Sequence, residues 1–222
     1  MQIINPGPED YHIHSINYSD GLMTIEEIVQ YAGKIGMEKI VITDHSQATN
    51  DKSGFAGKTY RSLIRRWKNV HNEVQVSFGI EGDLLNEDGE ICDHIQGKKS
   101  DFLILSAHKS VYQSNPNTIN QAYLKALERH HTKIAFLGHP CIRDFADYLD
   151  IEALTKNANQ YNIPLEVNGA NLLNNKTNKD NLRRMLTLAD IIYVNSDAHV
   201  LCELKTAREG AFKFLKEEGF LK

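Results

Sequence analysis

Residues 11–21 read YHIHSINYSDG and contain two histidines, His12 and His14, separated by one residue. Side chains alternate between the two faces of a β-strand, so both imidazoles leave the same face. Two imidazole nitrogens on one face can hold one divalent metal ion. Two half-buried histidines on a polar strand face would give the same pattern, so the rest of the chain decides between these interpretations.

The composition is that of an ordinary globular domain. The chain has 222 residues, of which 41% are hydrophobic and 24% charged, and its formal net charge is -4. No segment approaches the roughly 18 consecutive apolar residues that a membrane span requires, and the first residues lack the plan of a signal peptide. We therefore expect one cytoplasmic domain over residues 1–222, without membrane contact. No basic block is dense enough to follow a nucleic-acid backbone, so nucleic-acid binding stays open but unsupported, and the oligomeric state is not indicated.

Short apolar runs alternate with longer amphipathic segments along the chain. The runs predict strands over residues 11–14, 39–43, 75–81, 102–107, 134–138, 164–168 and 191–195. The amphipathic segments predict helices over residues 24–34, 60–72, 119–131, 151–161, 179–189 and 202–218. Thr24 and Glu27 form a capping box at the start of the first helix, and Gly36 ends it. Residues 84–99 fit no long helix, and Asp88-Gly89 indicates a tight turn there.

Strands that alternate with helices predict a parallel sheet with right-handed crossovers. About seven such units favour a closed or nearly closed barrel over an open sheet. In a parallel barrel, the carboxyl ends of the strands and the loops that follow them form the functional face.

Residue types that bind metals stand at the ends of six of these strands. They are His12, His14, Asp20, His45, Glu81, His108, His139, Asp197 and His199. Six imidazoles and three carboxylates exceed the three or four protein ligands of one catalytic zinc ion, so the sequence predicts two or three divalent metal ions. Nitrogen and oxygen ligands without thiolate suit zinc, manganese or iron and do not distinguish among them.

The order of eight short motifs resembles that of the PHP family, the polymerase and histidinol phosphatase superfamily. The motifs are HxH, SDG, TDH, GIE, SAH, GHP, LEVN and SDAH. The resemblance extends from about residue 10 to residue 218 and implies a distorted TIM-like barrel of seven βα units with a trinuclear site at its C-terminal mouth. It places His12, His14, Glu81 and Asp197 around a first metal ion, Glu81 with His108 and His139 around a second, and Asp20, His45 and His199 around a third. Asp20 stands where some relatives have histidine, a difference that bears on metal preference. Asp44 is interpreted as a carboxylate behind the ligands that orients an imidazole.

The resemblance implies a metal-dependent phosphoesterase that hydrolyses a small phosphomonoester, either histidinol phosphate or a broad range of esters. In this hypothesis the metal ions activate a bridging water as hydroxide for in-line attack on phosphorus, and Glu81, Asp197 and His199 are catalytic. Lys109 and Arg143 are predicted to bind the phosphate, although both could equally be solvated loop charges. Asn168 ends the sixth strand with an amide that could reach the substrate.

Three alternatives stay open on the sequence. One is a phosphodiesterase or exonuclease acting on nucleic acid, and another is a non-catalytic module that assists a DNA polymerase. The third is a metal-dependent amidohydrolase, whose barrel also starts with HxH and ends with an aspartate. Amidohydrolases usually bridge their metal ions with a lysine, whereas this chain has Glu81 at the matching position, so we rank this alternative last.

Overall fold

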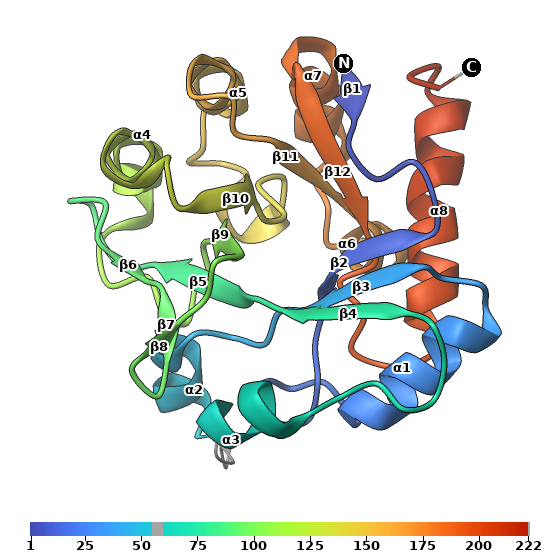
Figure 1. Ribbon diagram of the computed structural model, residues 1–222. Coiled ribbons are helices and arrows are strands. Elements are labelled where there is room, and N and C mark those ends of the chain that lie inside the picture. The colour runs from blue at the N-terminus through green and yellow to red at the C-terminus, as the bar shows by residue number, and fades with distance from the viewer. Residues whose placement is uncertain (55–59, 222) are drawn as a thin grey trace.

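The protein is an α/β structure with mostly parallel strands, shown in Figure 1. The computed structural model describes residues 1–54 and 60–221. The strands are β1 (Gln2–Ile3), β2 (Glu9–Ile13), β3 (Lys39–Ile42), β4 (Gln75–Phe78), β5 (Ile80–Leu84), β6 (Ile91–Cys92), β7 (His94–Ile95), β8 (Lys98–Lys99), β9 (Leu103–Ser106), β10 (Ile134–Leu137), β11 (Leu165–Asn168) and β12 (Ile191–Asn195). The α-helices are α1 (Ile25–Lys34), α2 (Gln47–Ser53), α3 (Tyr60–Arg66), α4 (Ile119–His130), α5 (Ile151–Gln160), α6 (Gly169–Leu173), α7 (Lys179–Leu188) and α8 (Glu203–Glu217), and η1 (Pro116–Thr118) and η2 (Arg143–Phe145) are 3-10 turns.

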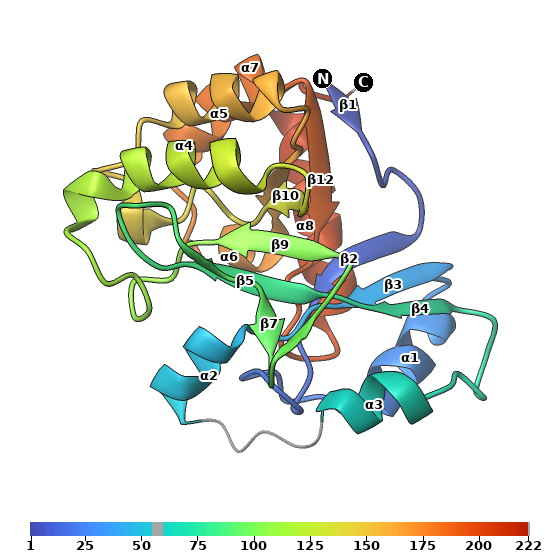
Figure 2. The same ribbon diagram turned by 60° about the vertical axis from the view of Figure 1, so that its left-hand side comes forward.

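Two sheets curve around a common interior (Figures 1 and 2). The larger has the order β1-β12-β11-β10-β9-β5-β6 and the smaller the order β2-β3-β4. Their strands run parallel, except that β6 is antiparallel to β5. Isolated bridges from Ile13 to Ala198 and from His45 to Glu81 join the two sheets. The predicted α/β fold with parallel strands is confirmed, but hydrogen bonding among the described strands does not close the barrel.

Gly79 explains where the barrel is interrupted. The strand predicted over residues 75–81 is divided there into β4, which pairs with β3, and β5, which pairs with β9. A Cβ atom at Gly79 would lie 2.7 Å from Thr43 Cγ2 and 2.9 Å from the Phe102 carbonyl oxygen. Only glycine therefore lets the chain pass this closely between the two sheets.

Side chains alternate between the two faces of each strand, so one apolar core forms between the strands and the helices outside them and a smaller one forms inside the barrel. Ile40 and Ile42 of β3 pack with α1, whereas Val41 faces the opposite way and contacts Tyr11, Ile104 and Phe136 inside the barrel. The helices α4, α5, α7 and α8 lie on the outer face of the larger sheet and bury a continuous apolar cluster against it (Figures 1 and 2). The strands are thus held from outside, and their carboxyl ends are left to carry polar side chains.

The predicted elements agree with the structure except at a few ends and in short pieces. Thr24 caps α1 through both bonds of the capping box, and Gly36 follows at a φ of 78°. The helix predicted over residues 60–72 ends at Arg66, because Asn69 accepts bonds from the backbone N–H groups of residues 71 and 72 and so replaces helical bonding. β1, α2 and α6 were not predicted. Among the described residues, no helix has the length and apolarity needed to cross a membrane.

Candidate metal centre

The strand ends bring all nine predicted ligands to one side of the barrel. His12 lies on β2, with His14 and Asp20 in the loop that follows it, and His45 follows β3. Glu81 lies on β5, while His108, His139, Asp197 and His199 follow β9, β10 and β12. Most of these side chains are buried, and only Asp20 has more than half of its side chain exposed, at 54%. Both sheets therefore contribute ligands to the same site.

Glu81 lies at the centre of this cluster. Its carboxylate is buried, and its oxygens lie within 3.5 Å of a ring nitrogen of five histidines. The distances are 3.5 Å to His12 Nε2, 3.5 Å to His14 Nε2, 2.7 Å to His45 Nδ1, 3.5 Å to His108 Nε2 and 2.8 Å to His139 Nε2. This placement suits a carboxylate that bridges metal ions.

The hydrogen bonding of the cluster tests whether metal ions fit it. His12 Nε2 and His14 Nε2 lie 3.1 Å apart, so they can form a hydrogen bond only if one nitrogen carries a proton and the other a lone pair. Glu81 Oε2 and His45 Nδ1 lie 2.7 Å apart, yet neither atom makes a hydrogen bond of acceptable geometry among the described residues, and the same holds for the buried Asp197 Oδ1. Buried polar atoms of this kind normally have partners. Nitrogen and oxygen atoms that converge without proton partners fit divalent metal ions.

Three overlapping sets of ligand atoms each lie within 4.8 Å of one another. They are His12, His14 and Glu81; His45, Glu81 and His108; and His14, His45 and His199. Asp20 Oδ1 adds a carboxylate at the rim of the third set, 3.3 Å from His45 Nε2 and 3.1 Å from His199 Nε2.

A second buried carboxylate, Glu166 on β11, holds several ligands in place. Oε1 accepts bonds from His12 Nδ1 at 2.9 Å and Asn195 Nδ2 at 2.9 Å. Oε2 accepts bonds from the His139 backbone N–H at 2.8 Å and Asn168 Nδ2 at 3.0 Å. A bond from Nδ1–H to Glu166 leaves the Nε2 lone pair of His12 free for a metal ion.

Asp83 has the same role for His108. Its Oδ1 lies 2.7 Å from His108 Nδ1, and its Oδ2 accepts bonds from Ser46 Oγ and Thr49 Oγ1 at 2.6 and 2.8 Å. Sequence reasoning missed both Asp83 and Glu166. The available signal was the alternation of strand side chains, because Asp83 is two residues after Glu81 and Glu166 is two residues before Asn168.

Comparison with known proteins identifies the family. The PHP domain family matches residues 10–168, which is more than half of the chain. The chain belongs to the PHP domain family. A protein of Citrobacter koseri named "Probable phosphatase" is 27% identical over 220 residues, covering 96% of this chain and 86% of the relative. The "Probable phosphatase YcdX" of Escherichia coli strain K12 is 26% identical over 182 residues, covering 80% of this chain and 71% of the relative.

Solved structures share the fold. The crystal structure of histidinol phosphate phosphatase from Lactococcus lactis, complexed with zinc, L-histidinol and phosphate, superimposes with a TM-score of 0.58 at 17% identity. The alignment covers 96% of this chain and 94% of that one. The crystal structure of a Listeria monocytogenes protein described as the "putative histidinol phosphatase hisK" gives a TM-score of 0.57 at 14% identity and covers 89% of this chain and 97% of the other.

The contacts of two residues in this PHP domain differ from the predictions. Asp44 was predicted to orient an imidazole. Its oxygens instead accept hydrogen bonds from the Ser15 backbone N–H at 2.6 Å and from Ser15 Oγ at 2.7 Å, so Asp44 fixes the loop after β2. Asn168 was predicted to bind substrate, yet its amide nitrogen donates to Glu166 and to Asp197 Oδ2, and its oxygen caps α6. We therefore interpret Asn168 as a residue that positions Asp197.

The two predicted phosphate-binding cations of the PHP domain lie near the site with different surroundings. Lys109 is exposed and lines a cavity of about 450 Å³ together with His108 and Asp144. Arg143 is exposed as well, but its Nε donates to the Asn175 carbonyl oxygen at 2.9 Å. Lys109 is therefore the better placed of the two to meet a ligand beside the cluster.

Burial and neighbouring charges shift the pKa values of the predicted ligands in opposite directions. Burial and the nearby His199 and His45 rings lower the pKa of His14 to about 3, which keeps its imidazole in the neutral form that binds metal. Burial opposes charge on His12, but the carboxylates around it outweigh this effect and raise its pKa well above the usual value. Burial likewise opposes charge on Glu81, but the surrounding histidines lower its pKa, so it remains a carboxylate.

Two of the predicted ligands have left-handed backbone conformations. His139 has a φ of 29° and Asp197 a φ of 54°. Side chains other than glycine seldom adopt such angles, and the strain concentrates at functional sites. The Glu166 bond to the His139 N–H and the Asn168 bond to Asp197 hold these two residues in place.

Proposed function

We propose that this PHP domain is a metal-dependent phosphatase that hydrolyses small phosphomonoesters at a site with up to three divalent metal ions. The observation that carries the proposal is the position of the Glu81 carboxylate, within 3.5 Å of five imidazole rings. The names of the curated relatives support phosphatase activity, and the zinc, L-histidinol and phosphate in the Lactococcus lactis structure support a small phosphorylated substrate.

The ligands are proposed to divide into three sets. His12, His14 and Asp197 hold the first metal ion, His108 and His139 the second, and Glu81 bridges these two. Asp20, His45 and His199 hold the third, at the exposed rim. Zinc, manganese and iron all suit this donor set. Bound divalent ions supply Lewis acidity and activate water for attack on phosphorus at neutral pH.

The residues of the chain orient the reaction. Glu166 and Asp83 fix the tautomers of His12 and His108 so that the nitrogen facing Glu81 carries the lone pair. Lys109 is proposed to contact the phosphoryl oxygens from the cavity beside His108, and Arg143 to add positive charge at its edge. The exposed position of Asp20 leaves the third ligand set open to substrate.

The test is phosphate release by manganese-, zinc- and iron-loaded protein. Suitable substrates are p-nitrophenyl phosphate, histidinol phosphate and nucleoside monophosphates, with bis-p-nitrophenyl phosphate as the diester. We expect monoesters to be hydrolysed and the diester to be hydrolysed poorly. Diester hydrolysis that exceeds monoester hydrolysis, or no phosphate release with any metal ion, would overturn the proposal.

Variants connect the activity to the cluster. Glu81→Gln should lower kcat/KM by more than the roughly 10–100-fold that loss of a partner behind a ligand costs. Its metal content, measured by elemental analysis, should fall as well. His71→Ala replaces an exposed histidine outside the cluster and should keep the activity and metal content of the wild type.

A further inference from the structure

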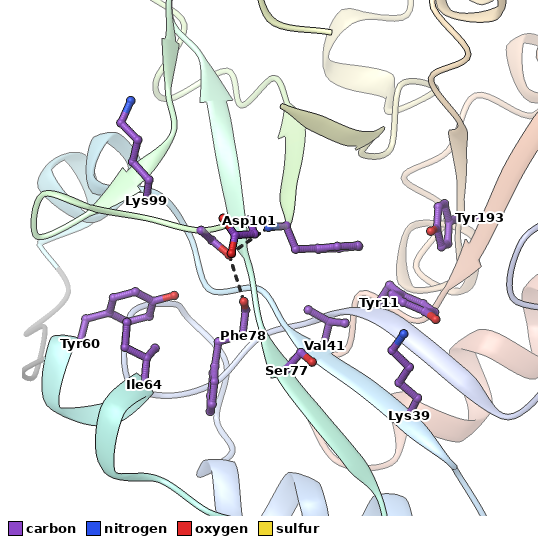
Figure 3. Close-up of a pocket in the computed structure, with 12 residues that line it drawn as sticks. Tyr11, Lys39, Val41, Tyr60, Ile64, Ser77, Phe78, Lys99, Asp101 and Tyr193 are labelled. Atoms are coloured by element: carbon purple, nitrogen blue, oxygen red, sulfur yellow. Dashed lines mark hydrogen bonds between the residues drawn. The ribbon is translucent and has the colours of Figure 1, made fainter. Parts of the chain in front are cut away.

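A second cavity lies on the opposite side of the barrel from the metal ligands. It has a volume of about 710 Å³ and is lined near the amino ends of β3 and β9, by Lys39 and Phe102, whereas the ligands follow the carboxyl ends of the strands. The interruption at Gly79 makes room for it, because β4 pairs with β3 alone among the described strands and leaves its other edge free. Ser100 Oγ donates to the Phe78 carbonyl oxygen at 3.0 Å across this opening (Figure 3).

The walls of the cavity are aromatic. Tyr11 and Tyr193 meet edge to face with ring centroids 5.1 Å apart, and Phe102 lies 5.7 Å from Tyr11. Tyr60 lines the far end, as Figure 3 shows. Barrel interiors are usually filled by branched aliphatic side chains. Here Val41 is the aliphatic residue that β3 contributes, and the rings surround open space of a size typical of ligand sites.

Three hydrogen-bond donors that line this space have neither a hydrogen-bond acceptor nor a carboxylate partner among the described residues (Figure 3). Lys39 Nζ lies 5.0 Å from the centre of the Tyr11 ring and forms no ion pair with the described carboxylates. Neither the Ser77 hydroxyl nor the Tyr193 hydroxyl has a hydrogen-bond partner within the described residues. An incoming molecule that offers acceptors would satisfy these donors, and its ring would stack on the aromatic walls.

The charges around the cavity favour a ligand without a phosphate group. Lys99 Nζ is bound to Asp93 Oδ2 at 2.8 Å, which neutralises that lysine. Glu9 Oε2 accepts a bond from the Tyr11 hydroxyl at 2.7 Å and adds negative charge near Lys39, and Asp101 lies in the wall. A phosphate ester would meet these carboxylates, whereas an uncharged ring would not.

We propose that this cavity binds an uncharged, planar nitrogen heterocycle of nucleoside size, independently of the metal centre. The ring stacks between the aromatic walls, and its acceptor atoms face Lys39, Ser77 and Tyr193. The site takes a different ligand class from the phosphomonoester proposed for the metal centre.

The test uses metal-loaded, full-length protein titrated with adenosine, guanosine and uridine by calorimetry and by tryptophan fluorescence. Trp67 is the one tryptophan of the chain, and its ring lies edge to face with Phe78 of the cavity wall at 5.8 Å. We expect at least one nucleoside to bind saturably below about 1 mM and to change this fluorescence. Absence of saturable binding by all three nucleosides up to that concentration would overturn the proposal.

Matched variants locate the binding. Ser77→Phe fills the cavity from an exposed strand position and should weaken binding about tenfold or more, whereas Gln75→Phe, on the same strand but outside the cavity, should bind like the wild type. Tyr193→Phe removes one hydroxyl and should weaken binding a few-fold without changing the fold. Binding that survives in both Ser77→Phe and Tyr193→Phe, or that inorganic phosphate displaces, contradicts a site in this cavity.

Discussion

At the scale of single residues, Glu166 has more influence on the metal centre than its position behind the ligands suggests. Its oxygens each accept two hydrogen bonds, and these bonds reach His12, the backbone of His139 and, through Asn168, the ligand Asp197. One buried carboxylate therefore orients three of the proposed metal ligands, which come from three strand ends.

Replacing this carboxylate tests that role. In Glu166→Gln an amide group would face two hydrogen-bond donors, so we expect metal affinity to fall about 10–100-fold, with much of the activity recovered at saturating metal. Metal titration of activity and calorimetry measure the two effects. Glu152→Gln changes an exposed glutamate on α5 and serves as the control. Wild-type metal affinity in Glu166→Gln would contradict the positioning role.

The residues of the metal centre were predictable to different degrees. Histidines and carboxylates at strand ends have few other reasons to gather, so the convergence of the nine predicted ligands on one site followed from their chemistry and spacing. Asp83 and Glu166 were missed: strand alternation puts them on the same faces as Glu81 and Asn168, but it does not show which hydrogen-bond donors they would accept from. The left-handed backbone conformation of His139 and Asp197 could not be predicted from the sequence either, because glycine, the residue that usually marks such a conformation, is absent from both positions.

At the scale of elements, the turn between β5 and β6 is packed tightly against α4. Gly89 has a φ of 73°, and a Cβ atom there would lie 2.6 Å from the backbone nitrogen of Ala126. Gly36 has a similar φ of 78° but open space around the Cβ position. A side chain at either position would strain the backbone, but only a side chain at Gly89 would also collide with a neighbouring helix.

Alanine substitution at both positions measures the two contributions. Gly36→Ala should lower the free energy of unfolding by about 1–3 kcal/mol, the usual cost of a left-handed residue. Gly89→Ala should cost about 1–3 kcal/mol more, because the backbone of α4 must move. Urea unfolding of the metal-loaded proteins gives both values. Equal losses would show that α4 accommodates the added methyl group.

The contact between α7 and the end of α8 predicts a pH dependence. Arg183 donates two bonds to Glu218, from Nε at 2.8 Å and Nη2 at 2.7 Å, and thereby lowers the pKa of Glu218. A lowered carboxylate pKa adds stability above the unfolded value of about 4.3 and loses it as the pH falls through the folded value. Glu218→Gln should therefore melt slightly below the wild type at pH 7, and the two melting temperatures should converge under acid conditions. A difference that persists unchanged below the folded pKa would contradict this ionic origin.

The elements themselves followed from periodicity where they are long. Each of the seven predicted strands and six predicted helices has a counterpart in the structure, because apolar runs mark buried strands and amphipathic spacing over several turns marks helices. The division of residues 75–81 was not predicted, since only the approach of Thr43 and Phe102 to Gly79 causes it. The five-residue α6 is too short for any periodicity to emerge.

At the scale of the whole molecule, the proposed metal ligands come from two sheets that share few hydrogen bonds. His12, His14 and His45 belong to the smaller sheet and its loops, whereas Glu81, His108, His139 and Asp197 belong to the larger one. Among the described residues, the β-bridges that join the two sheets are the isolated ones from Ile13 to Ala198 and from His45 to Glu81. Whether the strands close into a barrel could not be read from the sequence, because closure depends on contacts between distant segments.

Removing the metal ions should therefore destabilise the entire protein. Ions at about 1,000 times their dissociation constant add about 4 kcal/mol, which for a chain of this size corresponds to a melting temperature roughly 8–16 °C higher. A chelator should abolish this increment, and added zinc or manganese should restore it. Hydrogen exchange after chelation should rise most in β2 and β3, because the smaller sheet loses its link to the larger. Glu81→Gln, which lacks the proposed bridging ligand, should respond little to the chelator. If chelation leaves the melting temperature of the wild type unchanged, metal ions do not link the two sheets, and the isolated bridges and helix packing alone hold them together.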